Sequence, residues 1–234
     1  LGQGFPDLPW PDLVKHAAAT AITADLNQYA PSHGLPRLRR AIATTFEQSY
    51  GRAVDPDAEV TVTSGATEAL LATLLAILEP GDEVILIEPF YDAYPAQVVF
   101  AGGVPRYVPL QAPGWSLDLD ALAAAISPRT RAIVLNTPHN PTGKVFSREE
   151  LAGIAALCQE HDLIAISDEV YDRIIFDGAV HVPLATLPGM WERTVTVNST
   201  GKTFSMTGWK VGYAIAASAL TSAIRTTHQF ITFA

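Results

Sequence analysis

The stretch TVTVNSTGKTFSMTGWK, residues 194–210, sets a short β-branched run directly before a turn rich in serine, threonine and glycine. The alternation Thr-Val-Thr-Val is typical of a strand, and Gly201 marks a point where the strand has ended. Lys202 follows in that turn. The stretch therefore belongs either to a nucleotide-binding phosphate loop or to a site in which the lysine has chemistry of its own.

The phosphate-loop reading fails on one residue. A Walker loop reads Gly-x-x-x-x-Gly-Lys-Ser/Thr, so a loop ending at 201–203 needs glycine at 196, where the chain has Thr196 inside the predicted strand. GQGFPD at 2–7 misses the dinucleotide fingerprint in the same way, because its third glycine falls on Asp7. Neither Gly-x-Ser-x-Gly nor His-Glu-x-x-His occurs, so serine hydrolases and zinc peptidases lose their simplest support.

The strand before Lys202 is one of several short apolar runs separated by segments with helical periodicity. The runs that predict strands are 60–63, 83–87, 106–109, 132–136, 163–167, 194–197 and 211–216. The segments that predict helices include 66–78, 91–101, 148–161 and 219–230. Alternation of this kind predicts an α/β fold with a mostly parallel central sheet and helices on both faces. No linker divides residues 1–234, which we interpret as one domain.

The amino-acid composition limits the kinds of partner that the protein is expected to bind. Of 234 residues, 48% are hydrophobic and 17% charged, and the net charge of −9 comes with scattered basic residues, which argues against nucleic acid or an anionic membrane surface as a partner. The single cysteine, Cys158, forms no internal disulfide, and no apolar run approaches the ~18 residues that span a membrane. We expect a cytoplasmic protein with a small-molecule ligand. Its last residues stop inside an apolar pattern.

Ligands of such sheets gather at the carboxyl ends of the strands, and reactive residues recur there. Lys202 is placed to form a Schiff base with an aldehyde, and Asp168, after the run LIAIS, to pair with a pyridinium nitrogen. Tyr171 lies three residues on, so a helical turn would bring its phenol to the same side. Taken singly, each of the three also fits an ordinary structural role, as a surface lysine, a helix N-cap and a core tyrosine, and for the lysine and the tyrosine that role is the more common one.

Further residues complete a pocket for a phosphorylated pyridine aldehyde. Asn140, in the loop signal HNPTG, offers a hydrogen bond to a phenolate oxygen. The turn Ser64-Gly65-Ala66-Thr67 lies between a strand and a helix, where free backbone N–H groups hold phosphate. A hydroxyl and a cation for the phosphate, and a ring that stacks on the pyridine, are offered by Ser199, Lys210 and Tyr91. No metal site is expected.

Together these stretches resemble class I and II pyridoxal-phosphate aminotransferases of fold type I. The matching motifs are LGQGFPD, NQYAPSHGLPRLRRAIA, VTSGATEAL, EPFYDAY, NTPHNPTGK, SDEVYDRIIFDG and STGKTFSMTGWKVGYA. The resemblance implies pyridoxal 5'-phosphate as cofactor, with Lys202 as its aldimine lysine and Asp168 on the pyridine nitrogen. It implies Tyr171 and Asn140 on the phenolate oxygen and Tyr91 on the ring. The implied phosphate contacts are Gly65, Ala66, Thr67, Ser199 and Lys210.

The resemblance also implies a homodimer with shared sites, because a tyrosine at the position of Tyr29 reaches the phosphate of the neighbouring subunit. The backbone at Gly4, and Asn140, are implied substrate contacts. Residues 1–30 would form an N-terminal arm. The family often has arginine where this chain has Lys210. A further small domain with a carboxylate-binding arginine is expected to be absent from 1–234.

The implied reaction is transamination of an L-amino acid to its 2-oxo acid. LGQGFPD and EPFYDAY look most like the branch of kynurenine, glutamine–phenylpyruvate and methionine transaminases, which implies aromatic or sulfur-containing amino donors. N-succinyldiaminopimelate aminotransferases look similar. Two alternatives stay open: a cysteine-conjugate β-lyase that uses the same lysine, and a pyridoxal-phosphate-binding regulatory domain without turnover.

Overall fold

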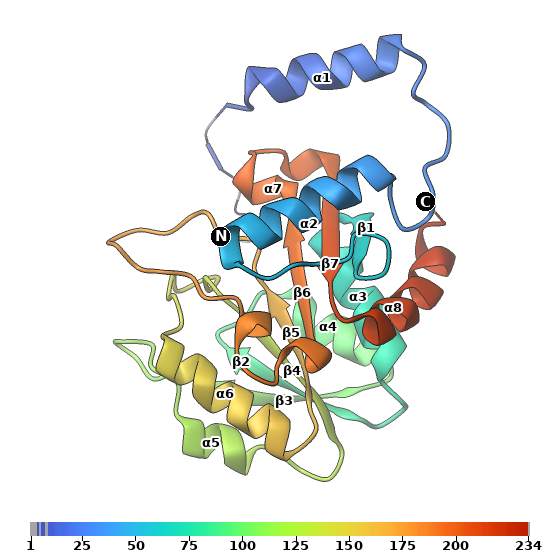
Figure 1. Ribbon diagram of the computed structural model, residues 1–234. Helices are drawn as coiled ribbons and strands as arrows, with labels where there is room; N and C mark the ends of the chain where they lie inside the picture. The colour runs from blue at the N-terminus through green and yellow to red at the C-terminus, as the bar shows by residue number, and fades with distance from the viewer. Residues whose placement is uncertain (1–3, 5, 8, 234) are drawn as a thin grey trace.

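The computed structural model describes residues 4, 6–7 and 9–233, and a seven-stranded sheet forms its centre (Figure 1). The strands lie in the order β1-β7-β6-β5-β4-β2-β3. They are β1 (Val60–Ser64), β2 (Glu83–Glu88), β3 (Val104–Pro109), β4 (Thr130–Asn136), β5 (Ile164–Asp168), β6 (Thr194–Ser199) and β7 (Val211–Ile215). Strands β2 to β6 pair in parallel, which confirms the mostly parallel sheet.

Strand β7 is the exception, because it runs antiparallel to both β6 and β1. Only residues 200–210 join β6 to β7. A crossover between parallel strands takes about a dozen residues or more, so this short connection returns the chain in the opposite direction. The turn that carries Lys202 is therefore a hairpin-like reversal at the end of β6, at the same edge where β5 ends.

Helices cover both faces of the sheet, as predicted. On one face α3 (Gly65–Ile77), α4 (Ala93–Phe100) and α8 (Ser218–Ile231) share a core with the strands, and on the other α5 (Leu119–Ala124) and α6 (Arg148–Glu160) do so. A third core lies under α2 (Pro36–Tyr50), against β1 and β7. Short helical turns complete the chain: α7 (Thr200–Thr203), η1 (Leu184–Thr186), η2 (Trp191–Arg193) and η3 (Thr207–Trp209).

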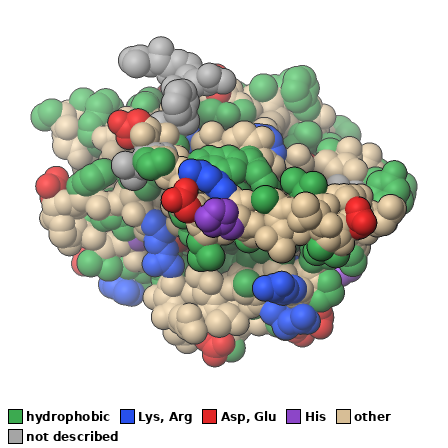
Figure 2. Space-filling model, turned by 90° about the horizontal axis from the view of Figure 1, so that it is seen from above, with side chains coloured by type: hydrophobic (Ala, Val, Ile, Leu, Met, Phe, Trp, Pro, Cys, Tyr) green, Lys and Arg blue, Asp and Glu red, His purple; other side chains and the backbone are tan. Residues whose placement is uncertain are grey.

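The helix α1 (Asp12–Thr23) buries none of its residues and stands away from the sheet (Figure 1). Seen from this end, hydrophobic side chains lie open on the surface (Figure 2). Leu13 is 81% exposed and Leu26, just after the helix, 75%. Across the described part of the chain, no helix has both the length and the apolar character needed to cross a membrane.

Candidate active site

Asp168 is the last residue of β5, in the middle of the sheet, and it is only 5% exposed. Its Oδ2 accepts a hydrogen bond from the hydroxyl of Tyr94 at 2.7 Å, and its Oδ1 accepts one from the backbone N–H of Val170 at 3.3 Å. Among the described residues it forms no ion pair. Burial raises the pKa of Asp168 to about 6, against the hydrogen bond from Tyr94, which lowers it. The site thus holds a buried carboxylate that lacks a cation.

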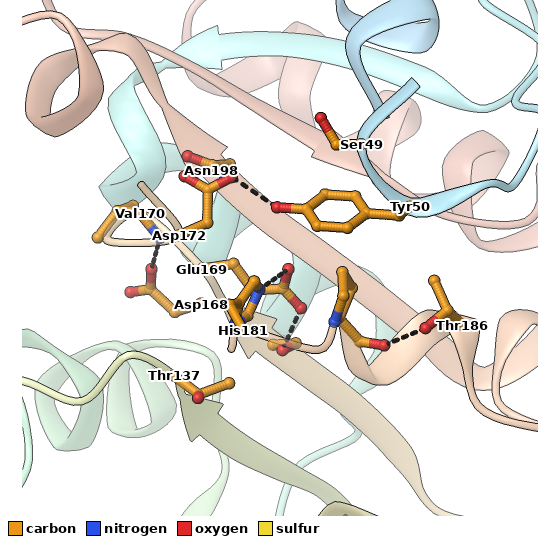
Figure 3. A network of polar contacts seen from close by, with 12 residues as sticks. Ser49, Tyr50, Thr137, Asp168, Glu169, Val170, Asp172, His181, Thr186 and Asn198 are labelled. Atoms are coloured by element: carbon orange, nitrogen blue, oxygen red, sulfur yellow. Dashed lines mark hydrogen bonds and ion pairs between the residues drawn. The ribbon is translucent and has the colours of Figure 1, made fainter. Parts of the chain in front are cut away.

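The residues on either side of Asp168, Ser167 and Glu169, belong to a buried network of polar contacts, part of which Figure 3 shows. Ser167 donates its hydroxyl to Glu169 Oε1 at 2.8 Å, and Nε2 of His181 lies 2.9 Å from Glu169 Oε2. Tyr50 closes the network by donating to Asp172 at 2.9 Å. The residues on both sides of Asp168 are held in this way, and the carboxylate itself is held by Tyr94 and the N–H of Val170.

The predicted helical turn after Asp168 is wrong in detail, since residues 170–173 form a turn without a helix. The hydrogen bond from the N–H of Val170 to Asp168 Oδ1 closes that turn, so the carboxylate caps a turn and not a helix. Asn136, at the end of β4, donates its side-chain amide to the backbone oxygen of Asp168 at 2.9 Å. Its own Oδ1 accepts the backbone N–H of Asn140 at 2.6 Å, which ties the HNPTG loop to the end of β5.

Lys202 lies in α7, immediately after β6, and it is partly buried. Its Nζ donates to the carbonyl oxygen of Gly4 and lies 5.5 Å from the centre of the Tyr171 ring. Burial lowers the pKa of Lys202, while the charge of Asp168 opposes the shift. The structure thus brings the lysine together with the tyrosine and with Gly4. The rest of the LGQGFPD motif lies partly outside the described residues, since 1–3 and 5 are not described.

The start of α3 carries the residues Gly65, Ala66 and Thr67, which are predicted to hold phosphate. Ser64 precedes the helix and makes no side-chain capping bond, so the first backbone N–H groups lack that partner. Gly65 has φ +75°, and a methyl group added there would lie 3.1 Å from both Cε and Nζ of Lys210. The ammonium group of Lys210 therefore stands directly over the helix start, where its charge adds to the helix dipole.

Two backbone segments meet at this point. A Cβ on Gly212 of β7 would lie 2.3 Å from the carbonyl carbon of Gly65 and 2.5 Å from the nitrogen of Ala66. Only glycine permits so close an approach. Ser199, at the end of β6, pairs with Gly212 in the sheet. The residues predicted to hold phosphate, Gly65, Ala66, Thr67, Ser199 and Lys210, thus come from neighbouring elements: the first turn of α3 and the facing ends of β6 and β7.

Two further residues, Tyr91 and Tyr29, are predicted to contact the cofactor, and the structure shows their surroundings. Tyr91 packs edge-on against Tyr94, with ring centres 5.6 Å apart, and Tyr94 in turn donates to the carboxylate of Asp168. Tyr29 is 82% exposed, and its ring contact is with Phe233 at 5.6 Å. Sequence reasoning missed Tyr94, although its spacing of three residues from Tyr91 places both rings on one side of the chain. Tyr94 is buried and is the direct hydrogen-bond donor to Asp168.

The chemistry of these groups fits pyridoxal phosphate. An uncapped helix start under a lysine suits the phosphate, a buried carboxylate without a cation suits a pyridinium N–H, and a lysine of lowered pKa suits the aldehyde. All three lie at one edge of the sheet, where ligands of α/β folds bind. Fold and groups together are those of a pyridoxal-phosphate enzyme.

Comparison with known proteins identifies the family. The sequence model of "Aminotransferase class I and II" matches residues 1–234, and the chain belongs to this family, whose members depend on pyridoxal phosphate. It is 47% identical to human kynurenine–oxoglutarate transaminase 1, covering 98% of this chain and 57% of that protein.

Solved structures agree with this assignment. The N-succinyldiaminopimelate aminotransferase of Mycobacterium tuberculosis superposes with a TM-score of 0.97 at 48% identity, over 100% of this chain and 61% of the other. YbdL of Escherichia coli, for which a methionine aminotransferase function is identified, gives 0.96 at 42% identity, over 99% and 61%. The chain spans about three fifths of the length of these relatives. The fold is that of the large domain of fold type I.

Proposed function

We propose that residues 1–234 are the cofactor-binding large domain of a pyridoxal-phosphate-dependent transaminase, with residues 1–30 as an N-terminal arm. One observation carries the proposal: at the same edge of the sheet, Lys202 stands over the Tyr171 ring and Asp168 is a buried carboxylate without a cation. The position of α1, which packs none of its residues into the three cores, supports an arm that is separate from the sheet.

Each residue has a distinct task toward the cofactor. Asp168 would bind the pyridine N–H, and its hydrogen bonds to Tyr94 and to the N–H of Val170 hold it in place for that contact. Tyr171 and Asn140 would donate to the phenolate oxygen, and Tyr91 would pack against the ring. The phosphate is held by the first turn of α3 with Ser199 and Lys210. When bound there, pyridoxal phosphate supplies an aldehyde that links to an amine and a ring that accepts the electron pair of the α-carbon.

Lys202 is the residue that moves protons. Its lowered pKa increases the fraction of free amine near neutral pH, and only the free amine takes a proton from carbon. The carbonyl of Gly4 accepts from the same nitrogen, which holds the amine at one place and leaves that backbone near the substrate. Asp168 would favour a protonated ring nitrogen, because a buried carboxylate stabilises a cation next to it.

For the substrate we propose an aromatic or sulfur-containing L-amino acid. Support comes from the names of relatives: kynurenine–oxoglutarate transaminases 1 and 3, and the methionine aminotransferase function of YbdL. The similar N-succinyldiaminopimelate aminotransferase gives a second substrate class to include in any assay. The family model matches aminotransferases, which favours transamination over β-elimination or a sensor without turnover.

We further propose a cytoplasmic homodimer in which Tyr29 serves the partner's site. An 82% exposed tyrosine on a connecting segment supports this, because such a ring is free to contact a second copy. Mixing Tyr29→Phe with Lys202→Ala tests it. Shared sites restore tight cofactor binding in the mixed dimer, since one site then has both native residues. If Tyr29 acts within its own subunit, mixing restores nothing.

The function is tested by absorption spectroscopy of the purified protein with added pyridoxal phosphate. We expect a band at the edge of the visible range that is absent in Lys202→Ala and present in the surface control Lys15→Ala. Adding methionine, kynurenine or phenylalanine should convert it to a shorter-wavelength band and release the 2-oxo acid.

Two other outcomes separate the alternatives. Pyruvate, ammonia and a released thiol without an oxo-acid acceptor would identify a β-lyase. A band that responds to none of the donors, N-succinyldiaminopimelate included, would contradict turnover and favour a sensor. No band in the native protein would contradict the assignment of Lys202 itself.

A further inference from the structure

His228 is a buried side chain that joins three segments of the chain behind the start of α3. Its Nδ1 lies 2.9 Å from Oε1 of Glu68, in the first turn of α3, and its Nε2 lies 2.5 Å from the carbonyl oxygen of Ser32. The Thr232 hydroxyl, 3.4 Å from Nδ1, is able to donate or accept. A carboxylate and a carbonyl only accept, so each ring nitrogen has to donate a proton. The contacts are those of an imidazolium.

The charges around His228 favour this form on balance. The hydrogen bond to Glu68 is the largest effect and raises the pKa of His228, and the carbonyl of Ser32 acts in the same direction. Burial and Arg225, one turn earlier on α8, oppose it. His33 faces the same cluster, but burial and Arg225 lower its own pKa, so it is the less readily charged of the two histidines.

Glu68 has a second contact that matters for the proposed site. Its Oε2 accepts the backbone N–H of Ser64 at 3.0 Å, so this carboxylate fixes the turn in which Gly65, Ala66 and Thr67 follow. A carboxylate suits the positive end of a helix, but it repels a phosphate that binds there. A protonated His228 cancels that negative charge while leaving the hydrogen bond to Ser64 in place.

The third segment that His228 joins, at Ser32, lies along β1, the strand that leads into α3. Gly34 has φ +100° and packs so closely on β1 that an added methyl group would lie 2.3 Å from Val62 Cγ2. The backbone N–H of Val62 donates to the carbonyl of His33 at 3.1 Å. The bond from His228 to Ser32 therefore holds a segment that already lies along β1, and it joins this segment to the first turn of α3.

We propose that His228 is a positioning residue for phosphate binding: it neutralises Glu68 and ties the Ser32 segment and α8 to the turn at the start of α3. This rests on the proposed function, in which that turn holds the phosphate of the cofactor. The consequence is a preference for phosphate that falls as the pH rises and His228 loses its proton. The residue acts through Glu68 and touches neither cofactor nor substrate.

The test compares the affinities of pyridoxal phosphate and pyridoxal for the full chain between pH 7 and 9. The aldehyde reacts with Lys202 in both, so the ratio of the two dissociation constants isolates the phosphate, whose second pKa near 6 leaves it dianionic throughout. In the native protein and in the surface control His161→Gln, we expect the preference for the phosphorylated form to fall on the order of tenfold.

Two variants should change the preference for pyridoxal phosphate over pyridoxal in opposite directions. In His228→Gln no positive charge neutralises the carboxylate of Glu68, so the preference is low at every pH. In Glu68→Gln nothing remains to be neutralised, so the preference stays high up to pH 9. A purely structural role would make both variants lose affinity alike at every pH, and that result overturns the proposal.

Nitrogen-15 spectra of the histidine side chains give a readout that needs no cofactor. Two protonated ring nitrogens on His228 at pH 7 are expected, and a neutral ring overturns the proposal. The two failures are distinguishable. Absence of binding of either aldehyde contradicts the proposed function, whereas binding with an unchanged ratio in His228→Gln contradicts only the role of His228.

Discussion

Replacing Asp168 by asparagine should stabilise the cofactor-free protein while weakening its hold on pyridoxal phosphate. Burial raises the pKa of this carboxyl from 3.8 to about 6. The folded state then binds the proton more tightly than the unfolded state, so stability is lost as the pH rises from about 4 to above 6. Roughly two pH units at 1.36 kcal/mol each set an upper limit of about 3 kcal/mol on the cost of the ionised group at pH 8.

Asparagine is neutral at every pH and removes that cost, but its amide satisfies the N–H of Val170 and the hydroxyl of Tyr94 less well. We expect a net gain of about 1–2 kcal/mol at pH 8, or roughly 4 °C in melting temperature for a chain of this size. Thermal unfolding of the cofactor-free protein at pH 4.5 and pH 8 measures it.

At pH 4.5 the two proteins should melt at nearly the same temperature, and the exposed control Asp177→Asn should follow the native protein at both pH values. Affinity for pyridoxal phosphate, measured on the same samples, should fall because the pyridine nitrogen loses its counter-ion. If Asp168→Asn melts at or below the native temperature at pH 8, the carboxylate is well satisfied without a cation, and the reasoning from its burial is refuted.

Three further experiments test the packing and the charges of the fold. Gly212→Ala puts a methyl group against the backbone of Gly65, so it should lower the free energy of unfolding by about 3 kcal/mol and remove most of the affinity for phosphate. In the control Gly114→Ala the methyl group meets open space, so that variant should melt like the native protein, and equal melting temperatures for the two variants would contradict the close approach at Gly212. Glu83 is buried, accepts hydrogen bonds from Arg106, Ser127 and Arg129, and has its pKa lowered from 4.5 to about 2. The ionised carboxylate therefore stabilises the fold fully at pH 7, and most of this stabilisation is lost by pH 2.5, because the unfolded chain is already protonated there. Glu83→Gln should accordingly lower the melting temperature at pH 7 and much less at pH 2.5. Burial raises the pKa of the Cys158 thiol to about 12, so a thiol reagent should modify it only after unfolding, and rapid labelling of the native protein would contradict its place in the core.

Much of the fold follows from local sequence signals. Strands buried on both faces appear as apolar runs, and the predicted runs agree with the structure to within two residues at each end. The helices that sequence reasoning did not predict are α1, α2 and α5. For α2 the signals were present, since Pro36 occupies its first turn and Gly51 ends it in the left-handed conformation. For α1 no buried face exists, so no periodicity toward a core marks it.

The candidate site divides in the same way. Lys202, Asp168 and the turn at Gly65 stand directly after strands, so the topology of a parallel sheet is enough to bring them together. Contacts that depend on how a helix packs against the sheet cannot be predicted from local sequence patterns. Tyr94 and Asp168 lie 74 positions apart, and His228 and Glu68 lie 160 apart. No local pattern encodes these distances, because they arise only when α4 and α8 settle on one face of the sheet.

These long-range pairs have a common physical logic. The positions that bind a charged ligand must be incomplete without it, so the free protein carries a buried carboxylate without a cation and a helix start without a cap. Each deficit needs support from a residue that does not touch the ligand. Tyr94 stabilises the ionised carboxylate of Asp168, and His228 neutralises the carboxylate of Glu68 that fixes the helix start. A substitution of Tyr94 or His228 should therefore change the pH dependence of pyridoxal phosphate binding while the protein stays folded.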